Sequence, residues 1–509
     1  MMFTKITIPF RILTIVMIIG LLGSGCNKQL DAPSSHLVNE ENHWKSITDT
    51  RSALLGTYGL LRAAMADNNG HWLYGELRNG DFKATSRLDL KAIIGGNLNA
   101  PYPAVQSLSN WRRFYAVINS ASIFIERAHE VLENDRQYTE RNYQVDIAQM
   151  RALRAFAYFY MTRIWGDVPL ITSSKDGNFE KKARSSKEAV LGYAESELLK
   201  AVNDLPFRYG SVLDPVFPGL YYGQVTTYWS GVLLTKISAY AILAHIAAWN
   251  EKYIDASGYA NFVLTYYQNS GASYTLTAGI SKIDGVFYDK NPAQIFGVPF
   301  AWTDREASIV GHIEDLTLAA PLVTKPVPQI YVPDATILSI YNEDKDQRFS
   351  INPLTGRAVT DFFANFGSSS TVFSKIKCIR NASTDGSLGL FSSAIVFTRL
   401  EEISLLYAES MAVIGNVGPA IDALDNVRLA RGLSSYSGPN SGLIDAIFKE
   451  RKRELIGEGW NWYDQVRYNR IMKNNIEFNK LISSNGIFWP IAEDVLSRNS
   501  LLVQNEFWR

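Results

Sequence analysis

The stretch RALRAFAYFYMTRIWGDVPLIT (residues 151–172) decides the fold, because it joins a long helical pattern to an abrupt stop. Its apolar residues recur at helical spacing, and the surrounding pattern predicts one amphipathic helix over 143–165. Trp165 is expected to pack against the body, Gly166 to end the helix with a positive φ, and Pro169 to prevent its continuation. We therefore interpret the Trp-Gly-Asp sequence as a helix end and not as a reactive site.

Helical spacing also recurs on both sides of this stretch. It predicts further helices at 47–66, 110–134, 186–204, 226–250, 256–268, 396–414, 418–431, 441–458 and about 460–482. The irregular stretches between them, rich in Gly, Asn, Ser and Pro, are 67–108, 206–223 and 270–394. The last is long enough to hold short strands, short helices and functional loops.

Alanines recur in a way that indicates paired helices. Ala244 and Ala256 are 12 residues apart, and so are Ala408 and Ala420. Small residues at this spacing let two antiparallel helices approach closely, as in tetratricopeptide-type pairs. The expected fold is therefore mainly α, built from tetratricopeptide-like helix pairs with long irregular loops and a few short strands.

Several segments, in order along the chain, resemble one known family. They are residues 151–172, CNKQLDAPSS (26–35), TRLEEISLLYAESMA (398–412), LDNVRLARGL (424–433), KERKRELIGEGWNWYDQVRY (449–468) and FWPIAEDVLSRNSLLVQNEFW (488–508). The chain is identified from them as similar to the SusD/RagB family, outer-membrane lipoproteins of Bacteroidetes. Its ending departs from the usual Asn-Pro and Gly-Tyr of that family. The resemblance implies a helical body that caps a SusC-like TonB-dependent transporter barrel and captures a nutrient, most often a glycan.

The N-terminus carries the features of a lipoprotein signal. Two basic residues and no acid precede the apolar run ILTIVMIIGLLG (12–23), which at about 1.5 Å per residue is too short to span a bilayer. Small residues then lead to Cys26, although Leu22 lies one position further from it than in the usual lipobox. We predict a signal peptide over 1–25, lipidation of Cys26 and a flexible tether over 26–40. The alternatives are a cleaved signal with a chance cysteine and an uncleaved anchor.

Composition argues against nucleic acid as a binding partner, and the cysteine content argues against a disulfide framework. Fifty basic and fifty acidic residues cancel, so nucleic acid is not an expected partner. The other cysteine, Cys378, has no partner if Cys26 is acylated, which excludes a disulfide framework. We expect an N-terminal helical part over 41–270 and a C-terminal part over 271–509, packed together as one globular body at the cell outer membrane.

The segment ERKRELIGEGWNWYDQ (450–465) has the most enzyme-like composition. Glu450, Glu454 and Glu458 follow the spacing of one helix face, and paired carboxylates are what a glycoside hydrolase needs. Basic residues lie among them: Arg451, Arg453 and Arg467. Ion pairs with these residues would lower carboxylate pKa values, the opposite of what a general acid requires. We therefore interpret the segment as scaffold and expect no catalytic residue.

Metal and cofactor motifs do not stand out in the sequence. The histidines show no HxH, HxxxH or HExxH arrangement, so no metal site is predicted. His245 lies among apolar residues, and we expect it to be a satisfied core residue. The chain has no Walker loop, dinucleotide fingerprint or GxSxG elbow, so no cofactor is expected.

Ligand-binding residues are expected in the irregular stretches. Sugars offer apolar faces to aromatic rings and hydroxyl rims to Asn, Asp or Arg side chains. The predicted set of ligand-binding residues is Trp72, Asp81, Asn99, Tyr102 and Trp302. The alternative for each aromatic residue is that it anchors a long loop to the helices.

The sequence thus predicts a non-catalytic surface receptor that captures an oligosaccharide or polysaccharide and delivers it to the transporter. A receptor for peptide or another non-glycan nutrient is the first alternative. A lipid-anchored glycoside hydrolase is the second.

Overall fold

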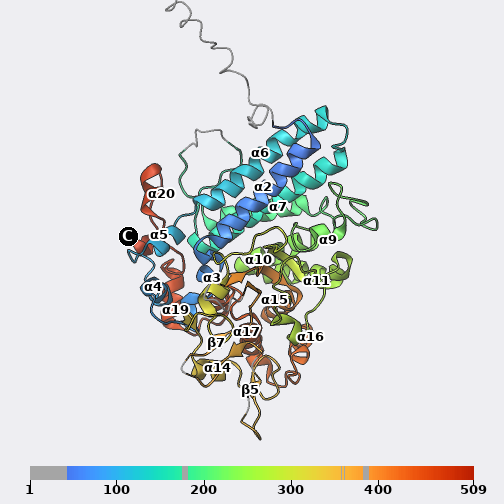
Figure 1. Cartoon of the computed structure of the whole chain (residues 1–509). Coiled ribbons are helices and arrows are strands. Elements are labelled where there is room, and N and C mark those ends of the chain that lie inside the picture. Colours follow the sequence, from blue (N-terminus) through green and yellow to red (C-terminus); the bar gives the residue numbers. More distant parts are fainter. Residues whose placement is uncertain (1–42, 175–180, 357, 360, 369, 382–388) are drawn as a thin grey trace, which may run out of the picture. The chain divides into compact units, whose positions relative to one another are not determined.

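The long helices of the N-terminal half lie side by side (Figure 1). The computed structural model describes residues 43–174 and 181–509, except 357, 360, 369 and 382–388. The predicted signal peptide, tether and Cys26 lie outside these residues. The chain divides into Met1–Lys45 and Ser46–Arg509, and the helices and strands that follow belong to the second unit. The predicted division near residue 270 stays a prediction.

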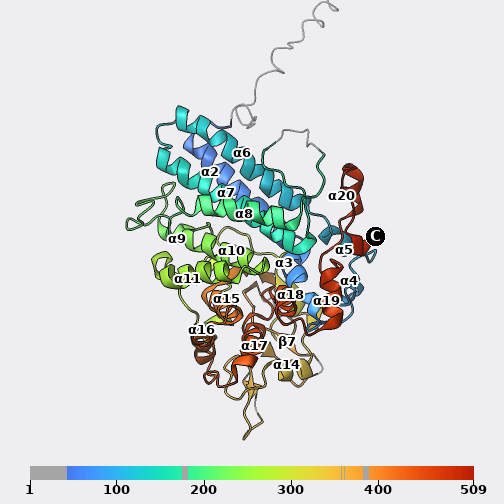
Figure 2. The same cartoon turned by 180° about the vertical axis from the view of Figure 1, so that it is seen from behind.

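The first layer is built from four helices. They are α2 (Ile47–Ala66), α6 (Arg112–Asn134), α7 (Glu140–Trp165) and α8 (Lys187–Ala201). The α7 helix begins at a capping box in which Thr139 and Asn142 satisfy free backbone groups. It ends as predicted, with Trp165 buried and Gly166 at φ 73°. Figure 2 shows α8 lying between α7 and α10 (Lys236–Trp249).

The second layer confirms the predicted helix pairs. Along with α10 it contains α11 (Tyr253–Ser270), α15 (Leu400–Val413), α16 (Val417–Ala430) and α17 (Leu443–Leu455). The helices pack in the order α10, α11, α15, α16, with α17 against α15 and α16. Ala244, Ala256, Ala408 and Ala420 are all fully buried, as close approach of the paired helices requires.

Several predicted helices were too long. The segment predicted as 396–414 begins as strand β10 (Ile395–Arg399), because this buried run pairs antiparallel with β2 (Gln294–Val298). The segment predicted as 460–482 breaks into α18 (Asn461–Met472) and α19 (Ile476–Ser483) at Lys473, which has φ 51°. The segment predicted as 226–250 divides similarly into α9 (Thr226–Trp229) and α10.

The long irregular stretches hold short elements, as expected. The short helices are η3 (Asp67–Asn69), α3 (Gly70–Gly75), η4 (Leu77–Asn79), α4 (Leu88–Ile94), α5 (Pro103–Leu108), α12 (Thr277–Ile280), α13 (Ile313–Thr317), α14 (Asp334–Ile340), η5 (Asn440–Gly442), α20 (Glu493–Arg498) and η6 (Glu506–Trp508). The remaining strands are β1 (Lys83–Ala84), β3 (Ile330–Tyr331), β4 (Ser350–Ile351), β5 (Ala358–Val359), β6 (Phe363–Ala364), β7 (Val372–Phe373), β8 (Ile379–Asn381) and β9 (Leu390–Phe391). All pair antiparallel in two-stranded sheets, as β1–β3, β4–β5, β6–β7 and β8–β9.

A close backbone contact joins the loops of the two halves. A Cβ atom on Gly75, at the end of α3, would lie 1.8 Å from the carbonyl oxygen of Gly459. Only glycine fits at such an approach. Nearby, Nε2 of His71 lies 3.1 Å from the carbonyl oxygen of Glu458. These two contacts hold the start of the 67–108 stretch against the C-terminal half of the chain.

Candidate functional site

Two of the five predicted ligand-binding residues are buried in the structure. The side chain of Trp72 is within the core, with 2% of its surface exposed. Asp81 is 6% exposed, accepts a hydrogen bond of 2.7 Å from Asn461 and forms an ion pair of 2.7 Å with Lys452. Neither side chain offers a free face to a ligand, and ligand contact by either residue stays a prediction. The burial of Trp72 fits the alternative of an aromatic that anchors a loop.

The other three lie at the surface but not together. Asn99 is exposed in the loop between α4 and α5, and Tyr102 is half-buried directly before α5. Trp302 is 43% exposed. It lies on a turn that Glu306 closes by accepting a hydrogen bond of 2.8 Å from the backbone N–H of Ala301. Of these three residues only Asn99 lines the cavity described next.

A cavity of about 680 Å³ opens where the loop of Asn99 meets the end of the chain. We call it the polar cavity, and its principal polar and aromatic lining residues are Asn99, Gln106, Asn110, Asp494, Gln504 and Trp508. They come from the α4–α5 region and from the segment that contains α20 and η6, which lie close together in Figure 1. Its volume is within the range of about 300–1,000 Å³ that is usual for ligand pockets.

Hydrogen bonds hold one wall of the polar cavity in place. The Asn110 side-chain amide donates to both oxygens of Asp494, at 3.2 and 3.1 Å, and Arg112 forms an ion pair with the same carboxylate. The backbone N–H of Ala492 donates to the carbonyl oxygen of Ser109 at 3.0 Å. These contacts fix the start of α20 against the residues that lead into α6.

The other wall is fixed by the last residues of the chain. The Gln504 side chain accepts from the N–H of Ile491 at 2.9 Å and donates to its carbonyl oxygen at 2.8 Å. The Trp508 indole N–H donates to the carbonyl oxygen of Phe488 at 2.8 Å, which orients a half-buried ring. Asn99 makes one long contact of 3.5 Å to the carbonyl oxygen of Trp508, so most of its hydrogen-bonding capacity is free.

The sequence analysis missed the C-terminal wall of this cavity. Residues 488–508 stood out as a family-like segment, but nothing in their spacing indicates that they meet the loop around Asn99. The fold brings this segment next to the loop around Asn99, and only then do Asp494, Gln504 and Trp508 line a cavity. The Gly-rich loop 95–103 was the one local signal that pointed to this place.

The glutamates of the enzyme-like segment lie in a buried cluster of charges. Glu454 is fully buried and contacts the guanidinium groups of Arg348, Arg399 and Arg431 at 3.0, 2.8 and 2.8 Å. Burial raises the pKa of Glu454, but the charges of Arg431, Arg399 and Arg348 outweigh burial and hold this pKa well below its usual value. A carboxylate held ionised in this way cannot serve as a general acid.

Two details of this cluster differ from expectation. Glu458 lies beyond the end of α17 at Leu455, because Gly457 turns the chain with φ 78°, so the three glutamates do not share one helix face. Glu450 pairs with Arg453 at 3.2 Å, as expected. The other two arginines contact different acids: Arg451 contacts Glu402 and Asp464, and Arg467 contacts Glu409 and Asp464.

A second buried acid lies in the first helical layer. Asp146 accepts hydrogen bonds from Tyr138 at 2.9 Å, from Tyr222 at 2.5 Å and from Tyr221. Burial raises the pKa of Asp146 to about 7, although these hydroxyl groups act to lower it. It does not line the polar cavity, and we assign it a structural role.

His245 is a satisfied core residue, as predicted. Its Nε2 atom lies 3.0 Å from the Glu402 carboxylate. Burial lowers the pKa of His245, against the opposing effect of Glu402. Within the described ranges, no cluster of three or more His, Cys, Asp or Glu side chains is arranged to hold a metal ion. Of the helices found there, none has the length and apolar content to cross a membrane.

Comparisons with known proteins agree on the family. The family model described as "SusD family" matches residues 364–486. A crystal structure of a SusD superfamily protein from Bacteroides thetaiotaomicron is 46% identical, covers 92% of this chain and 99% of its own, and superposes with a TM-score of 0.84. The chain belongs to the SusD family. Proteins of the SusD family are generally non-catalytic binding proteins.

More distant matches extend over nearly the whole SusD-like chain. SusD-like protein P38 of Formosa agariphila is 25% identical and aligns over 99% of both chains. A SusD homolog from Bacteroides thetaiotaomicron, 22% identical, shares the fold with a TM-score of 0.74 over 91% of this chain and 99% of its own. The family and the mainly helical fold expected from the sequence are thereby confirmed.

Proposed function

We propose that this SusD-family chain is a non-catalytic lipoprotein of the outer membrane, exposed at the cell surface. It captures a glycan and delivers it to a SusC-like TonB-dependent transporter. The observation that carries the proposal is the polar cavity, in a chain whose family is one of binding proteins.

The lining of the polar cavity suits a ligand rich in hydroxyl groups. Asn99 and Gln106 offer amide donors and acceptors, and Trp508 offers an aromatic ring. Each net hydrogen bond to a sugar hydroxyl contributes about 0.5–1.5 kcal/mol, so affinity arises from several such contacts together. Tyr102 and Trp302 do not line the polar cavity, and we retain both as proposed secondary ligand contacts.

The carboxylates of the polar cavity favour binding over hydrolysis. Glu493 and Asp494 are neighbours on the short α20 helix, and Arg112 and Asn110 already bind Asp494. Glycoside hydrolases instead place an acid and a second carboxylate on opposite sides of the scissile bond, about 5–9.5 Å apart. The polar cavity lacks that opposed arrangement among the residues that line it.

Membrane attachment is proposed through Cys26. Two or three acyl chains on one cysteine hold a protein stably at a bilayer, whereas one chain holds it only marginally. The predicted tether over 26–40 then lets the body remain above the membrane as a cap on its transporter.

Isothermal titration of the soluble part of the mature chain, from residue 27 onward, against a panel of polysaccharides and peptides tests the proposal. We expect saturable heat with one glycan class, with affinity weakened in Trp508→Ala and retained in Leu354→Ala, a control at a side chain 93% exposed in the β4–β5 connection. Binding of peptides and of no glycan would indicate a receptor for a peptide nutrient instead. Continuous heat that grows with time and protein concentration would show turnover and contradict a non-catalytic role.

A further inference from the structure

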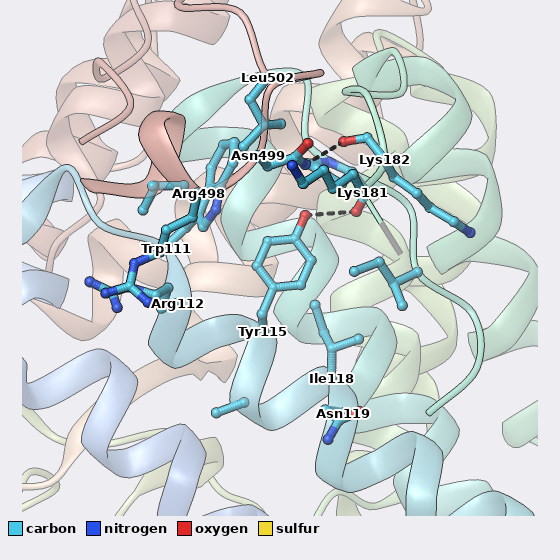
Figure 3. A pocket seen from close by; sticks show the side chains of 14 residues that line it. Trp111, Arg112, Tyr115, Ile118, Asn119, Lys181, Lys182, Arg498, Asn499 and Leu502 are labelled. Carbon is cyan, nitrogen blue, oxygen red and sulfur yellow. Dashed lines mark hydrogen bonds between the residues drawn. The ribbon is translucent and has the colours of Figure 1, made fainter. Parts of the chain in front are cut away.

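A second cavity, of about 470 Å³, uses the other residues of α20 (Figure 3). Whereas Glu493 and Asp494 line the polar cavity, Val495 and Arg498 line this one. We call it the basic cavity. Most of its surface is apolar, from Tyr115, Ile118, Pro169, Ile171, Val495 and Leu502.

Basic side chains surround this apolar surface. They are Arg112, Lys181, Lys182 and Arg498, and none of the described residues that line the cavity is acidic. Arg112 is paired with Asp494 on the polar side of α20. Lys181, Lys182 and Arg498 have no ion pair with any carboxylate in the part of the chain that the structure describes. The basic cavity therefore carries positive charge that the described residues do not neutralise.

Hydrogen bonds join the walls of the basic cavity before any ligand binds. The Tyr115 hydroxyl donates to the carbonyl oxygen of Pro169 at 2.7 Å, and the Asn499 amide donates to the carbonyl oxygen of Lys182 at 2.9 Å. In Figure 3 the ring of Tyr115 lies between Arg498 on one side and Lys182 on the other. These contacts connect α6, the segment after α7 and the C-terminal segment into one preformed site.

We propose that the basic cavity binds a small organic anion, a carboxylate attached to an apolar aliphatic or aromatic body. The apolar walls take the body and the Lys181, Lys182 and Arg498 side chains take the carboxylate. A neutral sugar fits poorly, because the lining offers few amides, and a bare inorganic anion leaves the apolar surface unused. This inference concerns a separate site and does not depend on the glycan proposed for the polar cavity.

Titration of the mature chain with defined carboxylates tests this proposal, since the Ser46–Arg509 unit contains the whole cavity. The probes are decanoate, with an aliphatic body, and 4-hydroxycinnamate, with an aromatic one. We expect saturable binding of at least one probe, weakened by added salt. The uncharged methyl ester of 4-hydroxycinnamate and the polar anion glucuronate should each bind at least about tenfold more weakly. Equal binding of either comparison compound, or binding of neither probe, would overturn the proposal.

Variants locate the binding in the basic cavity. Lys181→Gln combined with Arg498→Gln, both at exposed side chains, should weaken the probe about tenfold. Ala116→Phe should fill the cavity and abolish binding, because Ala116 lines it from α6. Lys449→Gln, at an exposed lysine outside the cavity, is the matched control and should leave binding unchanged. Unchanged binding in both cavity variants would overturn the assignment of the site.

Discussion

The buried charge cluster around Glu454 and the polar cavity around Asn99 both contain polar side chains but have different roles. In the cluster, arginines surround each carboxylate, and every group is fully buried. In the polar cavity, Asn99 is exposed and makes one long hydrogen bond. Charge that is already compensated holds the fold together, whereas polar groups with free capacity are available to a ligand.

The comparison therefore divides mutational effects into two kinds. Changes in the cluster should alter stability and leave ligand affinity per folded molecule unchanged. Changes in the polar cavity should alter affinity and leave stability nearly unchanged. The predictions below test this division, from the largest expected effect to the smallest.

Removing the charge of Glu454 should have the largest effect. Glu454→Gln removes a buried carboxylate that contacts Arg348, Arg399 and Arg431 together. Breaking a buried ion pair in this way costs about 3–5 kcal/mol, measured as the free energy of unfolding in urea. Glu477→Gln, at an exposed glutamate, is the control and should change it by less than about 0.5 kcal/mol. A loss below about 1 kcal/mol for Glu454→Gln would show that the cluster is not a stabilising unit.

The pH dependence of stability should separate Glu454 from Asp146. The folded-state pKa of Glu454 lies well below its unfolded value, so its contribution is present above about pH 4.5 and is lost as the pH falls below that. The pKa of Asp146 rises from 3.8 to about 7 on folding, so its contribution is present below pH 3.8 and is lost as the pH rises through 7.

Unfolding free energies measured between about pH 3 and pH 8 test both signs. We expect Glu454→Gln to flatten the acid side of the curve of unfolding free energy against pH. Asp146→Asn should flatten the same curve between about pH 4 and pH 7. In each case the unfolding free energy should change by a few kcal/mol over that range. If Asp146→Asn left the slope between about pH 4 and pH 7 unchanged, the Asp146 carboxyl group would not be the source of that pH dependence.

Removing the Trp508 ring should weaken glycan binding about tenfold, which corresponds to about 1–2 kcal/mol of lost contact with a sugar face. Trp508→Phe keeps a ring and loses the indole N–H that bonds the carbonyl oxygen of Phe488, so it should bind more tightly than Trp508→Ala. Calorimetric affinities and thermal unfolding of both variants provide the test. Equal glycan affinity of Trp508→Ala and of the unaltered chain would show that the Trp508 ring does not contact the glycan.

The smallest effect is expected at Asn99. Asn99→Ala removes one amide that faces the polar cavity and should weaken glycan binding by about 0.5–1.5 kcal/mol. Asn97→Ala, two residues earlier, is the matched control, because Asn97 is also exposed but does not line the cavity. An equal loss in both variants, measured by titration, would indicate a general change in the loop and not a lost contact.

The sequence predicted the parts of the fold that local patterns control. The end of α7 at Gly166 and the burial of the four spaced alanines follow from helix capping and helix packing. The strand β10 could not be separated from the helix that follows it, because its pairing partner β2 lies about a hundred residues earlier in the chain.

The candidate site was less predictable, because it depends on contacts between distant segments. Asn99 was selected from its loop, but Trp72 and Asp81 were selected on the same grounds and are buried by packing that the sequence does not reveal. Asp494 and Trp508 lie about 400 residues from Asn99, and their role follows only from the meeting of the two segments.

A crystal structure of the mature chain with the glycan identified by titration tests the central claim most directly. We expect at least one sugar ring in the polar cavity, against Trp508 and within hydrogen-bonding distance of Asn99. A glycan bound elsewhere on the surface, with the polar cavity unoccupied by sugar, would contradict it.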